Sequence, residues 1–120
     1  MLKIAIPVLH VRSSQAAEEF YCSKLGFQQE FAYRPFEGRA DPCYMGLTRD
    51  SAELHVSSFS GDGVAGAAVY LLVDDVNALH EELRNKVPID TGPVDQSWGN
   101  REMYVKDPDG NSIRFTQPLE

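Results

Sequence analysis

The chain has 120 residues, 42% of them hydrophobic and 24% charged, a balance typical of one ordinary globular domain. Its formal net charge of -7 excludes the basic stripe that binds a phosphate backbone, so we expect no nucleic-acid partner. No apolar run approaches the roughly 20 residues that span a bilayer, and the first residues do not form a signal peptide. These features predict a cytoplasmic protein with no membrane partner.

The first half of the chain predicts one helix and four strands. A β-branched run over 2–11 indicates a strand, and Ser13 or Ser14 then caps a helix whose apolar residues keep helical spacing up to Gly26. Three further strands are expected over residues 27–33, 43–48 and 52–57. The polar loop between the first two of these strands carries Phe36.

After a stretch rich in Gly and Ser, the same order of elements begins again. A strand is expected over 68–73, followed by a helix with an aspartate cap at 74–75 and by a short strand over 87–89. A loop that contains Gly92 and Pro93 then leads to the last two strands.

The last two strands, over 101–106 and 112–117, alternate polar and apolar side chains as half-buried strands do. The segment 107–110 between them reads Asp-Pro-Asp-Gly, a combination that favours a tight turn, so the strands are expected to form a hairpin. Trp98 stands just before this hairpin, where it serves either as a core plug or as a platform for a ligand.

The two halves match at an offset of about sixty residues, with Val11 matching Val73 and Glu53 matching Arg114. A βαβββ unit is therefore used twice. We expect an α+β fold in which two βαβββ modules form curved mixed sheets around a cleft, because one helix covers only one face of a sheet. The expected boundaries within the single domain are residues 1–58, a linker over 59–66, and residues 67–120.

Several motifs accompany this duplicated pattern over the full length of the chain. They are FYCSKLGF at 20–27, VDDV at 73–76, and WG at 98–99 followed by DPDGN at 107–111. In this combination the chain resembles the vicinal oxygen chelate superfamily, and within it the bleomycin resistance proteins of the glyoxalase/bleomycin resistance group. The resemblance is specific for fold but not for activity, because members include metal-dependent lyases, dioxygenases, thiol transferases and metal-free drug binders.

The resemblance also implies where a metal site would lie. Enzymes of the superfamily carry one ligand near the start of the first strand of each unit and another in the last strand. Carried over to this chain, the first-strand positions fall on Ile6 and Ala68, and the last-strand positions on Glu53 and Arg114. Only Glu53 can bind a metal, and a shift of the alignment brings in His10 or His55 without completing a set. We therefore expect no metal, no other cofactor and no catalytic residue.

Aromatic side chains give the clearer functional signal, because a flat ligand gains about 0.5–1.5 kcal/mol on each ring beyond burial. The resemblance implies a homodimer whose clefts hold an extended drug, with Phe36 and Trp98 at the matching loop positions. The two arginines of the loop over 34–39 do not suit a cationic drug, which leaves an anionic or neutral ligand open. The expected ligand-binding residues are Phe36, Glu53, His55, Tyr70, Trp98, Arg101 and Arg114.

Two functions follow from these observations. The first, which the incomplete ligand set favours, is metal-free binding and sequestration of a small molecule, a glycopeptide-type antibiotic or similar, as in antibiotic resistance. The alternative is a metal-dependent lyase or dioxygenase of the superfamily, or a metal-free enzyme that uses Glu53 and His55. In either case, Glu53 and Arg114 either pair across the cleft or are solvated separately.

Overall fold

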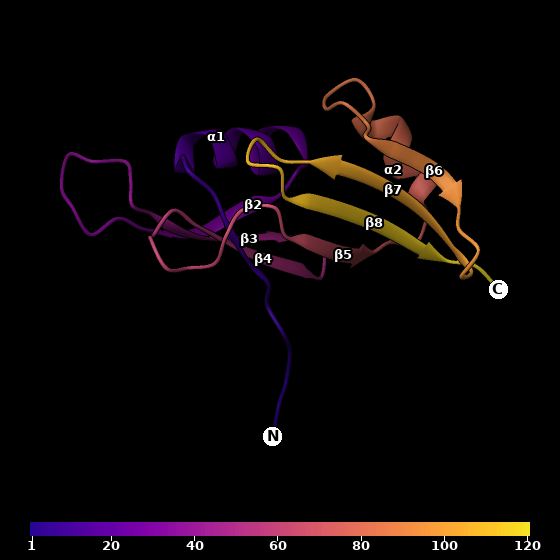
Figure 1. The fold of residues 1–120 in the computed structure, drawn as a ribbon, viewed down its shortest axis with the longest axis horizontal. Helices are drawn as coiled ribbons and strands as arrows, with labels where there is room; N and C mark the ends of the chain where they lie inside the picture. Colours follow the sequence, from indigo (N-terminus) through magenta and orange to yellow (C-terminus); the bar gives the residue numbers. More distant parts are fainter. The chain divides into compact units, whose positions relative to one another are not determined.

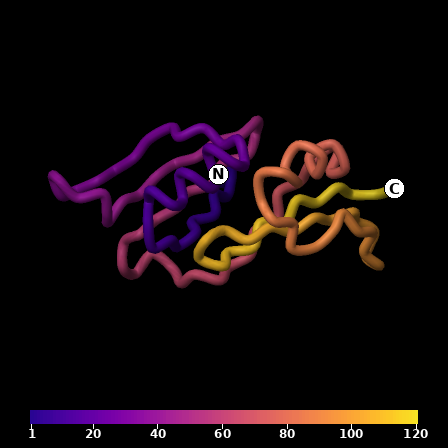
Figure 2. Tube along the Cα trace, turned by 90° about the horizontal axis from the view of Figure 1, so that it is seen from above, coloured from indigo at the N-terminus to yellow at the C-terminus, as the bar shows by residue number.

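The computed structural model describes all 120 residues, and the chain divides into two compact units, Met1–Ala65 and Gly66–Glu120. Each unit contains one four-stranded mixed sheet and one helical segment (Figure 1). Figure 2 traces the two units by colour, from indigo to magenta for the first and from orange to yellow for the second. The predicted α+β fold of two βαβββ units is confirmed. Neither unit contains a helix long and apolar enough to cross a membrane.

The first unit builds its sheet in the order β1-β4-β3-β2, with β1 parallel to β4 and the other pairs antiparallel. Its strands are β1 (Val8–His10), β2 (Gln28–Tyr33), β3 (Tyr44–Arg49) and β4 (Ala52–Ser57). Between β1 and β2, helix α1 (Ser14–Glu18) continues into the π-helical segment η1 (Glu19–Lys24). The strand predicted over 2–11 is thus much shorter. Pro7 has no N–H to donate, and the ladder with β4 begins at its carbonyl oxygen, which accepts from the N–H of His55 at 2.9 Å.

Helix α1 begins where the sequence predicts. The Ser13 hydroxyl oxygen accepts a hydrogen bond from the N–H of Ala16 at 3.1 Å, so Ser13 is the N-cap. Ser14 is instead buried, and its N–H donates to the Asp41 carboxylate at 3.0 Å. After η1 the chain turns at Gly26, whose φ of +78° is readily adopted by glycine.

The second unit repeats the arrangement in the order β5-β8-β7-β6, with β5 parallel to β8. Its elements are β5 (Ala68–Leu72), α2 (Val76–Leu83), β6 (Thr91–Asp95), β7 (Asn100–Lys106) and β8 (Ser112–Pro118). Asp75 is the N-cap of α2, since its carboxylate accepts from the N–H of Ala78 at 3.0 Å. The predicted hairpin of β7 and β8 is confirmed.

The short strand predicted over 87–89 is wrong. Val87 is a buried core residue, and the strand is β6, which contains the Gly92-Pro93 pair that the sequence assigns to a loop. The pairing of β6 with β7 changes register between Thr91 and Val94. The backbones are also close there, since a Cβ added at Gly92 would lie 2.2 Å from the carbonyl oxygen of Glu102. This irregularity breaks the alternation by which a strand is recognised in a sequence.

The turn between β7 and β8 is tied to the beginning of β5 by one buried side chain, Asn111. Its side-chain oxygen accepts from the N–H groups of Gly66 and Ala67 at 3.0 and 3.1 Å, and its amide nitrogen donates to Asp107 at 2.8 Å. Both ends of the amide are therefore satisfied inside the second unit.

Replacing Asn111 by Ala is expected to lower the free energy of unfolding by about 1–3 kcal/mol, because buried polar groups lose their partner. Urea denaturation followed by circular dichroism measures the change. Asp74→Ala, at an exposed position two residues before α2, is the control. Equal stability of the two variants would contradict the proposed role of the Asn111 amide.

Candidate ligand-binding site

Alternation along the strands gives each sheet one face toward the helix of its own unit and one face that this helix leaves uncovered. The helix-side residues form the buried core, for example Leu9, Met45, Leu47, Leu54, Val56, Met103, Val105, Ile113 and Phe115. The uncovered faces carry aromatic and charged side chains: Phe31, Tyr33, Tyr44, Glu53 and His55 in the first unit, and Tyr70, Glu102, Tyr104 and Arg114 in the second.

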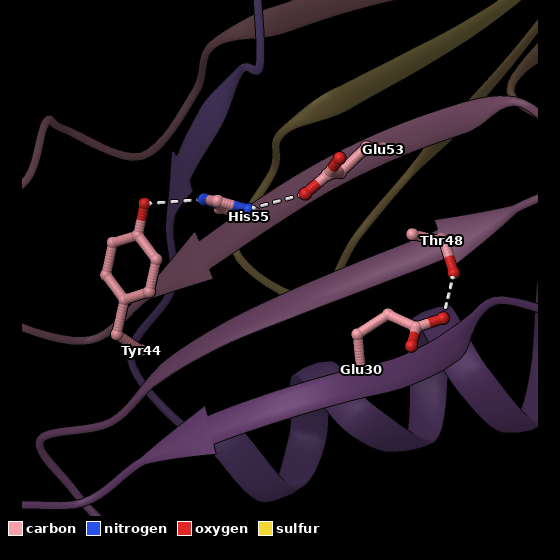
Figure 3. A network of polar contacts seen from close by, with 5 residues as sticks. All are labelled: Glu30, Tyr44, Thr48, Glu53 and His55. Atoms are coloured by element: carbon pink, nitrogen blue, oxygen red, sulfur yellow. Dashed lines mark hydrogen bonds and ion pairs between the residues drawn. The ribbon is translucent and has the colours of Figure 1, made fainter.

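In the first unit, a hydrogen-bonded chain joins Tyr44, His55 and Glu53 (Figure 3). The His55 Nε2 lies 3.0 Å from the Glu53 carboxylate, and Nδ1 lies 2.7 Å from the Tyr44 hydroxyl. Since a carboxylate only accepts, we assign the proton of neutral His55 to Nε2, so Nδ1 accepts from the tyrosine. Burial, together with the Asp62 carboxylate, raises the pKa of Tyr44 and keeps the phenol protonated as this donor.

An aromatic side chain that the sequence reading did not single out, Phe31, lies beside this chain. Its ring stacks on Tyr44 with centroids 6.2 Å apart and meets His55 edge-on at 5.4 Å. The ring also lies over Gly46, where an added Cβ would be 2.1 Å from it. A glycine inside a strand often marks such a close approach, and Gly46 was the signal available in the sequence. Figure 3 also shows the neighbouring hydrogen bond from Thr48 to Glu30, 2.6 Å long.

In the second unit, the polar centre is the buried carboxylate of Glu102. It accepts hydrogen bonds from Trp98 Nε1 at 2.9 Å, from the Asn100 amide at 3.3 Å and from the Tyr104 hydroxyl at 2.5 Å. Burial by itself raises the pKa of Glu102, but the hydrogen bonds from Tyr104, Trp98 and Asn100, together with the Tyr70 hydroxyl, outweigh it and lower this pKa. The hydrogen bond that Tyr104 donates to Glu102 raises the pKa of Tyr104, and burial raises it further.

This geometry excludes the first of the two predicted roles of Trp98, that of a core plug. The side chain is 58% exposed, so it is not a plug of the core. Its Nε1–H is nevertheless held by Glu102, which restricts the orientation of the ring. An exposed ring with a fixed orientation is suited to be a platform for a flat ligand.

The two predicted arginines of the second unit have different surroundings. The guanidinium carbon of Arg114 lies 4.7 Å from the ring centroid of Tyr104, and its Nε donates to the Ser112 hydroxyl at 3.3 Å. Arg101 is bound to the Asp95 carboxylate through Nε at 2.6 Å and a terminal nitrogen at 3.3 Å. Arg101 is one residue out of step with the strand positions of the uncovered face, so it lies on the other face of the sheet from Arg114.

The other predicted residues are described here within their own units. Glu53 and His55 are neighbours on β4, whereas Phe36 lies in the loop after β2 with Arg39 5.7 Å from its ring. In the second unit, Tyr70 is the strand partner of Arg114. The ion pair between Glu53 and Arg114, residues of different units, stays a prediction.

The ladders correct the predicted alignment of the repeat. Val8 and Tyr70 both lie three residues before the matched valines, and they pair with His55 and Arg114, respectively. His55 is therefore the counterpart of Arg114. The predicted match of Glu53 with Arg114 is wrong by two residues, a shift that preserves the strand face and is therefore invisible in the alternation.

The positions that the superfamily resemblance implies for metal ligands do not fit a metal ion in this chain. With the corrected register they fall on Ile6, Ala68, His55 and Arg114, of which only His55 has a metal-binding atom. Both ring nitrogens of His55 are already hydrogen-bonded. Within each unit, no group of three His, Cys, Asp or Glu side chains is placed to hold a metal.

The lowered pKa of Glu102 predicts a specific pH dependence of stability. A depressed carboxyl pKa contributes stability above the ordinary value of about 4.3, and this stability is lost as pH falls through the folded-state pKa. Urea unfolding, followed by Trp98 fluorescence at a series of acidic pH values, should show a steeper loss in the natural chain than in Glu102→Gln. Glu37→Gln, at an exposed loop position, is the control and should follow the natural chain. Parallel curves for the natural chain and Glu102→Gln would contradict the prediction.

Comparison with known proteins agrees with this fold over the whole chain. The family model described as glyoxalase superfamily protein matches residues 1–120. No curated protein matches the chain.

Several solved structures are similar to the chain. The bleomycin-binding protein from bleomycin-producing Streptomyces verticillus, complexed with copper(II)-bleomycin, is 30% identical, with 98% of each chain covered and a TM-score of 0.72. TnmS3, an antibiotic binding protein from Streptomyces sp. CB03234, is 25% identical, with 98% of each chain covered and a TM-score of 0.73. Lactoylglutathione lyase from Agrobacterium tumefaciens is 16% identical, with 97% of this chain and 94% of that chain covered, and its TM-score of 0.73 shows the shared fold alone. The resemblance seen in the sequence is thus confirmed, and the chain belongs to the glyoxalase superfamily.

Proposed function

We propose that the protein binds a small organic molecule on its uncovered sheet faces and sequesters it without chemical change. The observation that carries this proposal is the exposure of large aromatic side chains on these faces and at their edge. Phe31 is 45% exposed, Tyr70 48% and Trp98 58%. Exposed apolar groups gathered beside a few oriented polar groups are characteristic of a ligand-binding surface.

The polar groups beside these rings support binding over catalysis. Glu102 accepts from three side-chain donors, and its lowered pKa makes the carboxylate a weak base at neutral pH. In the first unit, one nitrogen of His55 donates to Glu53 and the other accepts from Tyr44. These hydrogen bonds therefore restrict the orientation of the aromatic side chains, and both nitrogens of His55 are engaged inside the protein.

The two more similar solved structures support the same proposal. One is described as a bleomycin-binding protein and the other as an antibiotic binding protein, at 30% and 25% identity over 98% of this chain. We therefore propose that the ligand of this chain is an antibiotic or a molecule of similar build, and that sequestration confers resistance to it.

Binding is tested by titrating the purified protein with bleomycin and following the fluorescence of Trp98, the only tryptophan. We expect saturable quenching, because the exposed ring is part of the proposed surface. The same sample is analysed for metals. Stoichiometric zinc, manganese, nickel or iron would contradict the metal-free proposal and favour the lyase or dioxygenase alternative.

A binding prediction for the first unit uses Phe31→Ala. Removing the ring is expected to weaken ligand binding by up to about tenfold, because a stacked ring contributes about 0.5–1.5 kcal/mol beyond burial. Isothermal titration calorimetry measures the affinity. Val64→Ala removes an exposed apolar side chain outside the strands and is the control. Equal affinity of both variants would exclude the first unit's face from the site.

We also propose that the protein is a homodimer, because each sheet has one face that its own helix does not cover. Sedimentation equilibrium is expected to give about twice the chain mass of 13.4 kDa at the concentrations used for binding. A mass near 13.4 kDa at these concentrations would contradict the proposal.

A further inference from the structure

The uncovered face of the second unit has a cation at its centre. Tyr70, Arg114 and Tyr104 are direct cross-strand partners on β5, β8 and β7, so they form one row across the sheet. In the next row, Leu72, Thr116 and Glu102 are partners in the same way. Arg114 thus stands between two aromatic residues in its row, and Tyr70 and Leu72, on the β5 side of it, are exposed.

The planar group of Arg114 is held by two contacts, one to its carbon and one from its Nε. The ring of Tyr104 supports the guanidinium carbon at 4.7 Å, and the buried Ser112 hydroxyl accepts from Nε at 3.3 Å. These contacts leave the terminal nitrogens, which are the donors that face away from the backbone. A guanidinium group with restricted motion loses little entropy when it binds a planar anion.

The acid that shares this face does not neutralise Arg114. Glu102 is one row away, and its carboxylate oxygens accept from Trp98, Asn100 and Tyr104. The ion pairs of the second unit join Arg101 to Asp95 and Arg84 to Glu81, and neither includes Arg114. The chain has a formal net charge of -7, yet this arginine has no carboxylate partner within its unit.

We propose that Arg114 binds the anionic group of a flat aromatic ligand, with the ring of that ligand lying on Tyr70 and Trp98. The proposal rests on the proposed function and names its ligand class: planar aromatic carboxylates and acids of similar geometry. Two terminal N–H donors match two carboxylate oxygens, and the charge-assisted bonds are stronger than neutral ones. Tyr70 and Trp98 are both about half exposed, which leaves ring area for stacking.

The loop after β2 agrees with an anionic ligand in the first unit as well. Arg39 lies 5.7 Å from the ring of the exposed Phe36, so this loop also presents a cation beside an aromatic side chain. The two places share only the same types of side chain, and the proposed anion site is at Arg114 alone.

Isothermal titration calorimetry with 2-naphthoate and its neutral amide, 2-naphthamide, tests the proposal at neutral pH. We expect the natural chain to bind the carboxylate at least about tenfold more tightly, as a charge-assisted hydrogen bond predicts. Arg114→Gln should abolish this preference. Arg114→Lys, which keeps the charge but loses the planar pair of donors, should retain part of it. Arg101→Gln removes the same charge from a site already paired with Asp95 and should retain it fully.

The remaining outcomes overturn the proposal in distinguishable ways. Equal affinity for both probes overturns it and leaves the proposed function standing. A carboxylate preference that survives in Arg114→Gln places the anion elsewhere. If the natural chain shows no carboxylate preference and Glu53→Gln does, then Glu53 is the natural partner of Arg114. If neither probe binds, the ligand class is wrong, and the bleomycin titration decides the proposed function by itself.

Discussion

Each unit of this protein has one short helical segment for a sheet of four strands, and that segment can cover only one face. The buried apolar residues therefore collect on the helix side, and the other face has to be stable while in contact with water, a ligand or a second copy. Within each unit, polar side chains on this face form hydrogen bonds to each other. What remains accessible on these faces includes the rings of Phe31, Tyr33 and Tyr70, together with the aliphatic side chains of Val8 and Leu72.

The two units satisfy the constraint with different chemistry at the same position. His55 in the first unit corresponds to Arg114 in the second, as the pairing with the first strand of each unit shows. His55 is the centre of a chain from Tyr44 to Glu53, so its hydrogen-bonding atoms are used. Arg114 rests on Tyr104 and keeps a charge without a carboxylate partner in its unit. Duplication therefore supplies one backbone arrangement that carries a hydrogen-bonded histidine in one unit and an arginine without a carboxylate partner in the other.

The buried carboxylate of Glu102 shows how orientation is obtained at low cost. Isolated, such a charge would be strongly unfavourable, but three donors from Trp98, Asn100 and Tyr104 offset its desolvation. The same bonds restrict the indole of Trp98 and the ring that supports Arg114. A surface whose rings are already oriented loses less entropy when a ligand binds, which is the property that sequestration requires.

The sequence by itself determined the elements that depend on local patterns: the caps at Ser13 and Asp75, the turn before β8, and the repetition that gives two βαβββ units. It missed β6, because the bulge at Gly92 interrupts alternation. Only the tertiary structure decided the register that matches His55 with Arg114, the burial of Glu102 and the place of Phe31 over Gly46. A shift of two residues keeps every side chain on its face, so strand pairing alone distinguishes the alternatives.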